Sequence, residues 1–159
     1  MTLYYLDASV WVKRYYRETG TDWVTQLFAS SQFLSCATLG YVEVRAALAR
    51  KQRTSPEEAG VFDRTAGQVQ EDWADFVRVA LTDEVLDHAV DLADRFALHG
   101  ADAVHLASAL VLRQRMPASL ERFAFVASDR ELKTAATRLG LAVLDPEQED
   151  SPNHISVGT

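Results

Sequence analysis

The chain is poor in the residues that mark several protein classes. Its 159 residues include one cysteine, seven glycines and four prolines. A single cysteine, Cys36, excludes an internal disulfide, and no short cysteine and histidine spacing indicates a zinc site. The composition therefore excludes collagen-like, disordered and disulfide-stabilised chains and argues against a zinc or redox enzyme.

Long hydrophobic runs are also absent. No stretch approaches the ~18 consecutive apolar residues of a membrane span. The first residues, Met1 to Asp7, form neither a basic segment nor an uninterrupted apolar segment of the kind found in export signals. We therefore expect a cytoplasmic protein with no membrane partner.

Basic residues are outnumbered by acidic ones. The 16 lysines and arginines against 23 aspartates and glutamates leave a formal net charge of −7, which argues against a protein that coats DNA or an anionic membrane. An apolar fraction of 48% suits one compact domain. We expect this domain over 1–146, followed by a polar tail over 147–159.

Short apolar runs alternate with segments of helical periodicity along the whole domain. Ser55 and Pro56 predict a helix start, and Gly140 predicts a helix end. The pattern predicts an α/β fold, a three-layer α/β/α sandwich around a mostly parallel sheet of about five strands. The expected strands are 3–6, 33–36, 76–80, 123–127 and 141–144, and the expected helices are 8–16, 20–30, 38–51, 55–72, 83–97, 101–114 and 129–138.

Two aspartates directly follow expected strands. Asp7 follows the first strand, and Asp129 follows Phe123-Ala124-Phe125-Val126-Ala127-Ser128. Ligands of open parallel sheets bind beyond the carboxyl ends of the strands, so both positions are candidates for a functional site. Each aspartate could instead simply cap the helix that follows it.

Two further acids lie on helices that are otherwise largely apolar. Glu43 shares a face with Leu39 and Ala46. A surface pairing with Arg50 or Lys51 would also explain it. Asp102 stands in the first turn of an alanine-rich helix, where an acid is also favoured by the helix dipole. His105, one turn later, is expected to be a hydrogen-bonded core residue rather than a catalytic base.

Four carboxylates brought together by a fold would repel one another unless a cation were present. Oxygen ligands without cysteine or a histidine pair favour Mg²⁺ or Mn²⁺ over zinc. Such ions act on phosphate esters by holding the phosphate and lowering the pKa of the attacking water.

The sequence around these acids resembles the PIN-domain ribonucleases, and most closely the VapC-type toxins of toxin–antitoxin pairs. The resemblance runs from Leu3 to about Pro146. The motifs that carry it are Tyr5-Leu6-Asp7-Ala8-Ser9, Glu43-Val44-Arg45-Ala46-Ala47-Leu48, Ala101-Asp102-Ala103-Val104-His105-Leu106-Ala107 and Val126-Ala127-Ser128-Asp129-Arg130-Glu131-Leu132.

The resemblance implies a Mg²⁺- or Mn²⁺-dependent endoribonuclease. Asp7, Glu43, Asp102 and Asp129 would be its catalytic and metal-binding residues. Ser9 would orient the first aspartate or the water. Ala127 stands where the family often has a hydroxyl residue, which leaves Ser128 as the neighbouring supporting candidate.

The resemblance also implies partners. Related toxins form homodimers and are inhibited by a small VapB-type antitoxin. Single-stranded or looped RNA is the expected substrate, because unstacked segments reach a recessed acidic site more easily than a duplex. Phosphate contacts could come from a set of basic residues that could equally be ordinary helix surface: Lys13, Arg14, Arg17, Arg45 and Arg50.

Other classes fit the sequence less well. Haloacid-dehalogenase-like phosphotransferases have a second aspartate two residues after the first, where this chain has Ser9. Receiver domains need an acid pair beside the first strand and a lysine closing a later one. A housekeeping RNA-processing nuclease and a catalytically degenerate PIN-like binding module remain open as alternatives to a toxin.

Overall fold

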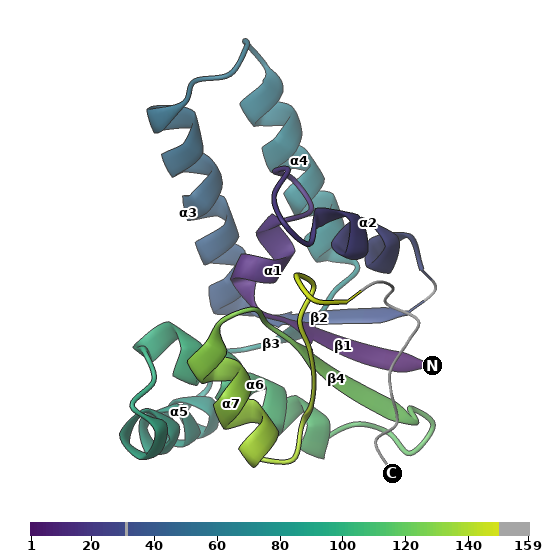
Figure 1. Cartoon of the computed structure of the whole chain (residues 1–159), viewed down its shortest axis with the longest axis vertical. Coiled ribbons are helices and arrows are strands. Elements are labelled where there is room, and N and C mark those ends of the chain that lie inside the picture. The colour runs from purple at the N-terminus through teal and green to yellow at the C-terminus, as the bar shows by residue number, and fades with distance from the viewer. Residues whose placement is uncertain (31, 150–159) are drawn as a thin grey trace.

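The centre of the molecule is a five-stranded sheet in which all neighbouring strands are parallel (Figure 1). The computed structural model describes residues 1–30 and 32–149. The strand order is β3-β2-β1-β4-β5, so the first strand lies in the middle. The strands are β1 (Thr2–Leu6), β2 (Phe33–Ala37), β3 (Val77–Val79), β4 (Arg122–Val126) and β5 (Ala142–Leu144).

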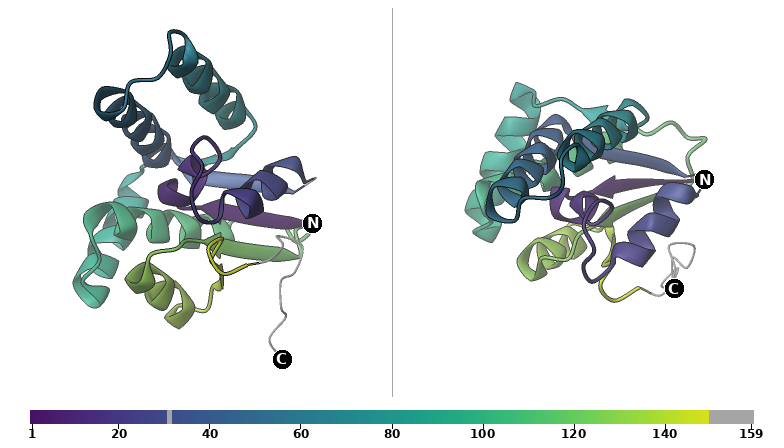
Figure 2. Two further views of the ribbon diagram at one scale, coloured as in Figure 1. Left: turned by 45° about the horizontal axis from the view of Figure 1, so that its top comes forward. Right: turned by 90° about the horizontal axis from the view of Figure 1, so that it is seen from above.

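Helices cover both faces of the sheet, which confirms the predicted α/β class (Figure 2). The first four helices pack against one face, and the last three pack against the other. Helices α3 and α4 also form a long hairpin that projects away from the sheet (Figure 1). The helices are α1 (Ala8–Val12), α2 (Thr21–Ala29), α3 (Thr38–Thr54), α4 (Val61–Ala74), α5 (Asp83–Phe96), α6 (Gly100–Gln114) and α7 (Arg130–Arg138).

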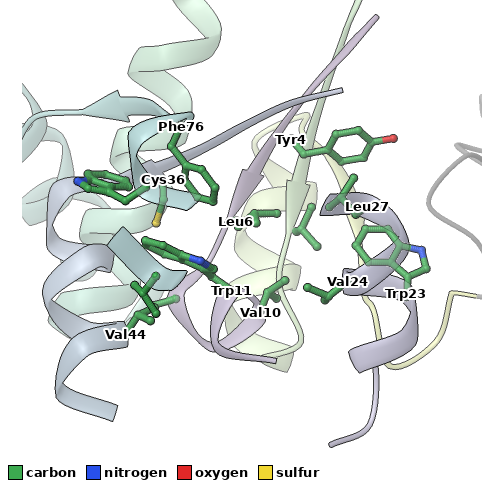
Figure 3. Packing of buried hydrophobic residues seen from close by; sticks show 14 of the residues in the cluster. Tyr4, Leu6, Val10, Trp11, Trp23, Val24, Leu27, Cys36, Val44 and Phe76 are labelled. Atoms are coloured by element: carbon green, nitrogen blue, oxygen red, sulfur yellow. The ribbon is translucent and has the colours of Figure 1, made fainter. Parts of the chain in front are cut away.

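Alternate side chains of β1 supply the two hydrophobic cores. Tyr4 and Leu6 point into the cluster beneath the first four helices, and Tyr5 points into the cluster beneath α5, α6 and α7. The first cluster is rich in aromatic rings (Figure 3). Trp11 is fully buried there, with its ring centroid 5.6 Å from that of Trp73. Burial on both faces explains why the strands are almost continuously apolar.

Two predicted helix boundaries are wrong. The helix expected from Ser55 begins only at Val61, because α3 continues to Thr54 and Ser55 is its C-cap. Gly60, with φ of 85°, directly precedes α4, and this left-handed conformation suits glycine. The first helix ends at Val12 rather than near residue 16.

The predicted stop at Gly140 is confirmed. Gly140 has φ of 79°, and its amide donates to the Thr137 carbonyl. The Leu141 amide donates to the Ala136 carbonyl. This is the paired hydrogen-bond pattern of a Schellman motif, which turns the chain from α7 into β5.

The segment after β5 returns across the molecule to the loop before α2. Pro146 is buried, and a Cβ added to Gly20 would lie 3.0 Å from its Cβ. The predicted boundary at residue 146 stays a prediction, since 150–159 of the expected tail lie outside the described residues. Within the described residues, no helix has the length and apolarity to cross a membrane.

Candidate active site

Asp7 occupies the carboxyl end of the central strand, where β1 meets α1. Asp7 is the N-cap residue of α1, but its side chain makes no capping hydrogen bond. Instead, Oδ2 accepts a hydrogen bond of 2.5 Å from the Ser9 hydroxyl. Only 9% of the side chain is exposed. A nearly buried carboxylate that does not cap its helix is available for another role.

His105 lies beside Asp7 and is held from both sides of its ring. The Tyr5 hydroxyl is 2.9 Å from Nδ1, and the same hydroxyl accepts the Ala37 backbone N–H at 3.1 Å. On the other side, Nε2 is 2.5 Å from Oε1 of Glu43 and 3.8 Å from Oδ1 of Asp7. The interpretation of His105 as a hydrogen-bonded core residue is confirmed.

Nε2 of His105 faces the carboxylates of Glu43 and Asp7, and two acceptors at this nitrogen favour the tautomer that carries its hydrogen there. If the ring is neutral, Tyr5 donates to Nδ1, and Nε2 then donates to Glu43; if it is charged, both nitrogens donate. Burial lowers the pKa of His105, but contacts with Tyr5, Cys36 and Glu43 raise it, and the net direction is upward. In this tautomer and in the charged ring, Nε2 donates to the Glu43 carboxylate.

Glu43 comes from α3, which follows β2, and reaches across to α6. Its partner is His105 rather than one of the arginines of its own helix. The side chain remains one third exposed, so the carboxylate is open to solvent on its far side. The tertiary structure thus brings Glu43 next to Asp7 although 36 positions separate them in the sequence.

Asp102 completes the acidic group from the first turn of α6. Its pKa is raised, first by partial burial and then by the charges of Asp7 and Asp129. His105 and His99 oppose this rise. The Asp102 side chain makes no hydrogen bond or ion pair with any of the described residues. Because the charges of Asp7 and Asp129 both act on Asp102, Asp102 lies near these two strand-end aspartates.

Asp129 differs from the other acids because it caps a helix. Its Oδ1 accepts the Leu132 backbone N–H at 2.8 Å, at the start of α7. The capping alternative raised by the sequence therefore holds for Asp129 and does not hold for Asp7. The second oxygen of Asp129 is left for interaction with the site.

The chemistry of these four residues fits a hard divalent cation. All four supply carboxylate oxygens, the ligand type of Mg²⁺ and Mn²⁺. After burial, the negative charges of Asp7 and Asp129 are the next causes of the raised pKa of Asp102. Among residues 1–30 and 32–149, no three acidic, histidine or cysteine side chains converge closely enough to form a ready-made metal centre. An ion held by these residues would need side chains that turn toward it.

The two serines have different surroundings. Ser9 bonds to Asp7 and so orients a site carboxylate. Ser128 instead donates to Oδ1 of Asp145 at 2.8 Å, and Lys133 bonds to the other oxygen at 2.6 Å. Burial raises the pKa of Asp145, but these two hydrogen bonds and the Glu147 amide outweigh it, so the pKa is lowered. Ser128 thus holds the chain after β5.

Three of the five basic residues considered for RNA contact are engaged by acids. Lys13 is buried and pairs with Glu18 and Glu147. Arg14 pairs with Asp72 through two nitrogens and lies over Phe28. The third, Arg17, pairs with Asp22. Such contacts leave these three groups poorly placed to bind phosphate.

The other two basic residues lie on α3 and form no ion pair with any described residue. Arg45 donates a long hydrogen bond of 3.4 Å to the Tyr41 hydroxyl. Arg50 is exposed near the end of the helix.

Comparison with known proteins identifies the family. The model of the PIN domain family matches residues 4–138. The chain belongs to the PIN domain family. Two proteins of Mycobacterium tuberculosis, Ribonuclease VapC45 of strain CDC 1551 and Ribonuclease VapC49 of strain H37Rv, are each 37% identical to it over 154 residues. Each match covers 92% of this chain and all of the relative.

The fold of this PIN domain is shared with solved toxin–antitoxin structures. VapBC2 from Rickettsia felis, crystallised with a promoter DNA fragment, superposes with a TM-score of 0.62 at 9% identity. The match covers 90% of this chain and 98% of that one. The resemblance noted from the four motifs is thereby confirmed at the level of family and fold.

Sequence reasoning missed two residues that organise this PIN domain. Tyr5 carries the hydroxyl that fixes His105, but within an apolar strand it looked like a core residue only. Asp145 is a buried strand-end aspartate. The signal for it was present, because Asp145 directly follows the apolar end of β5 just as Asp7 follows β1.

Proposed function

We propose that this PIN domain is a Mg²⁺- or Mn²⁺-dependent endoribonuclease and the toxin of a VapBC-type pair. The observation that carries the proposal is the placement of Asp7 and Glu43 against His105, with Asp102 within electrostatic range of Asp7, at the carboxyl edge of the sheet. The ribonuclease names of its two relatives from M. tuberculosis support the substrate class.

The four acids would hold the divalent ion, and the protein would keep them in place. When bound, the ion would supply charge stabilisation at the phosphate and lower the pKa of the attacking water. Ser9 orients Asp7, and His105 orients Glu43. Asp129 contributes a carboxylate whose position is fixed by its capping bond. We expect cleavage to give 5′-phosphate and 3′-hydroxyl ends.

Cleavage assays test the activity. Purified protein is incubated with single-stranded and structured RNA in Mg²⁺, Mn²⁺ or EDTA, beside Asp7→Asn and Asp102→Asn variants. We expect metal-dependent cleavage that both variants lose, with single-stranded RNA preferred. Cleavage in EDTA, or full activity of both variants, would overturn the proposal.

Partners and compartment belong to the same proposal. Toxin–antitoxin complexes among the structural neighbours support a small antitoxin partner. We further propose a homodimer in the cytoplasm. Induction in a bacterial cell should arrest growth, and co-expression of a small protein encoded next to this chain should restore it. Harmless expression of active protein would favour a housekeeping nuclease instead.

A further inference from the structure

One face of α7 is bordered by a surface hollow on each side. The hollow toward residues 145–149 measures about 480 Å³, and the hollow toward the end of α5 measures about 490 Å³. Arg130, Thr134 and Arg138 line both hollows. Their spacing of four residues places them along a single helix face. The helix thus presents two arginines between two depressions.

The arginines of this region are free of acidic partners. Within the described part of the chain, Arg95, Arg130 and Arg138 form no ion pair, although all three are exposed. Glu131 lines one hollow, and Glu149 and Asp145 line the other. Asp145 is paired with Lys133. The α7 face is therefore locally basic in a chain whose net charge is −7.

Two of these arginines are held in place by an aromatic ring. The guanidinium carbon of Arg95 lies 4.9 Å from the centroid of the Phe96 ring, and that of Arg138 lies 5.4 Å from it. Two like charges thus share one ring. Stacking restricts the arginine side chains, which lowers the entropy lost when they bind an anion. A guanidinium also matches phosphate through paired N–H donors.

The basic face begins at the candidate active site. Arg130 directly follows Asp129, the acid whose charge influences Asp102. From Arg130 to Arg138 the helix advances by about 12 Å at 1.5 Å per residue. A chain of phosphates leaving the site along α7 would meet the arginines in succession.

We propose that Arg130, Arg138 and Arg95 bind the sugar–phosphate backbone of single-stranded RNA beyond the position of cleavage. This inference rests on the proposed ribonuclease function. It assigns RNA contact to the face of α7, in place of Lys13, Arg14 and Arg17, which are engaged by acids.

Fluorescence anisotropy tests the assignment with the full chain. An Asp7→Asn background prevents cleavage, and the probe is a labelled single-stranded RNA of about 16 nucleotides of mixed sequence. One variant carries Arg95→Gln, Arg130→Gln and Arg138→Gln. Its matched control carries Arg53→Gln, Arg64→Gln and Arg122→Gln, which removes the same charge from exposed arginines that also lack ion pairs among the described residues.

We expect the α7 variant to lose tenfold or more in affinity, and the control to lose less than about twofold. The slope of log affinity against log salt should fall by about 2 in the α7 variant alone, because three phosphate contacts are lost at about 0.7 each. Circular dichroism verifies that both variants are folded.

Equal losses in both variants, or no loss in the α7 variant, overturn the inference. The inference is also overturned if the α7 variant keeps its affinity for RNA but no longer binds a poly-glutamate peptide. That result would assign the face to an acidic protein segment. RNA cleavage by the wild-type chain, which keeps Asp7, is measured in parallel. If that chain cleaves RNA and the α7 variant binds normally, only this inference fails; if it does not cleave RNA, the proposed function fails first.

Discussion

Two uncharged residues determine where the charged groups of the site lie. Tyr5 contributes one hydroxyl, which joins the Ala37 amide to His105 and through it to Glu43. Gly40 has no side chain, so α3 can approach Cys36 and His105 closely. Neither residue carries a charge, but both act on the position of the acids.

Replacing Tyr5 by phenylalanine should loosen His105. The Ala37 amide and Nδ1 of His105 would lose a buried partner, which we expect to cost about 1–3 kcal/mol of unfolding free energy. RNA cleavage should fall by about tenfold or more even well below the melting temperature, because Glu43 is no longer held in register. Urea unfolding and cleavage rates measure the two effects.

Tyr16→Phe is the control for this change. Tyr16 is half-buried, and Nζ of Lys51 lies 4.6 Å from the centroid of its ring. Phenylalanine would retain this contact. Stability should stay within about 0.5 kcal/mol of the wild type. Wild-type cleavage by a folded Tyr5→Phe protein would contradict the positioning role.

An alanine at Gly40 should destabilise the fold. Its Cβ would lie 2.2 Å from the Cys36 sulfur and 3.1 Å from Cε1 of His105. Overpacking of this kind costs about 1–3 kcal/mol. The double change Gly40→Ala with Cys36→Ala should recover part of the loss, since the sulfur is removed. Thermal unfolding followed by circular dichroism measures both.

Gly67 offers the matched control for this substitution. It also lies inside a helix, α4, but an added Cβ would meet no atom within 4 Å. Gly67→Ala should therefore stabilise the protein by up to about 1 kcal/mol through helix propensity. Equal effects of alanine at Gly40 and Gly67 would show that close packing at Gly40 is unimportant.

At the scale of single elements, the ends of helices decide which acids are free. Helix α1 begins without a side-chain cap, so the Asp7 carboxylate can serve the site. Helix α5 is capped by Thr82, whose side chain accepts the Val85 amide. Helix α7 is capped by Asp129, whose charge also acts on Asp102.

Two substitutions of Asp129 separate its structural role from its chemical one. Asparagine keeps the capping oxygen and removes the charge, so stability should change by less than about 0.5 kcal/mol. Alanine removes both and should cost about 1 kcal/mol. Both variants should lose RNA cleavage. If Asp129→Asn cleaves as fast as the wild type, Asp129 is a helix cap and nothing more.

At the scale of the whole molecule, charge is unevenly distributed. The net charge of −7 argues against a protein that coats DNA or an anionic membrane. A net value does not describe the separation between the acids at the sheet edge and the free arginines of α7. Local fields decide binding at short range, because salt screens charges more than about 10 Å apart.

Removing one site carboxylate should stabilise the protein in EDTA. The pKa of Asp102 is raised, so its ionised form opposes folding at neutral pH, and this penalty is relieved as pH falls through the raised pKa. Asp102→Asn should raise the melting temperature at pH 7 by up to about 4 °C. The gain should shrink at acidic pH, where wild-type Asp102 is protonated.

The same thermal assay reports ion binding. Mn²⁺ at 100 times its dissociation constant should stabilise the wild type by about 2.7 kcal/mol, and Asp102→Asn should show a much smaller rise. Asp87→Asn, which removes an exposed acid of α5, should behave like the wild type. Identical Mn²⁺ responses of Asp102→Asn and the wild type would contradict a role for Asp102 as an ion ligand.

Local patterns in the sequence were enough to predict the α/β class, the parallel sheet and the strand-end positions of Asp7 and Asp129. These features follow from hydrophobic period and from the geometry of parallel strands, both of which are local. The start of α4 at Val61 was missed, because the capping signal of Ser55 and Pro56 competes with the continuation of α3.

Only the tertiary structure decided which groups meet. The contact between Glu43 and His105 joins residues 62 positions apart, and the Tyr5 contact with His105 joins residues 100 positions apart. Likewise, Lys13 pairs with Glu147 and Arg14 with Asp72, while Arg130 and Arg138 form no ion pair with the described residues. Such pairings depend on how helices pack across the sheet, and no short sequence window contains that information.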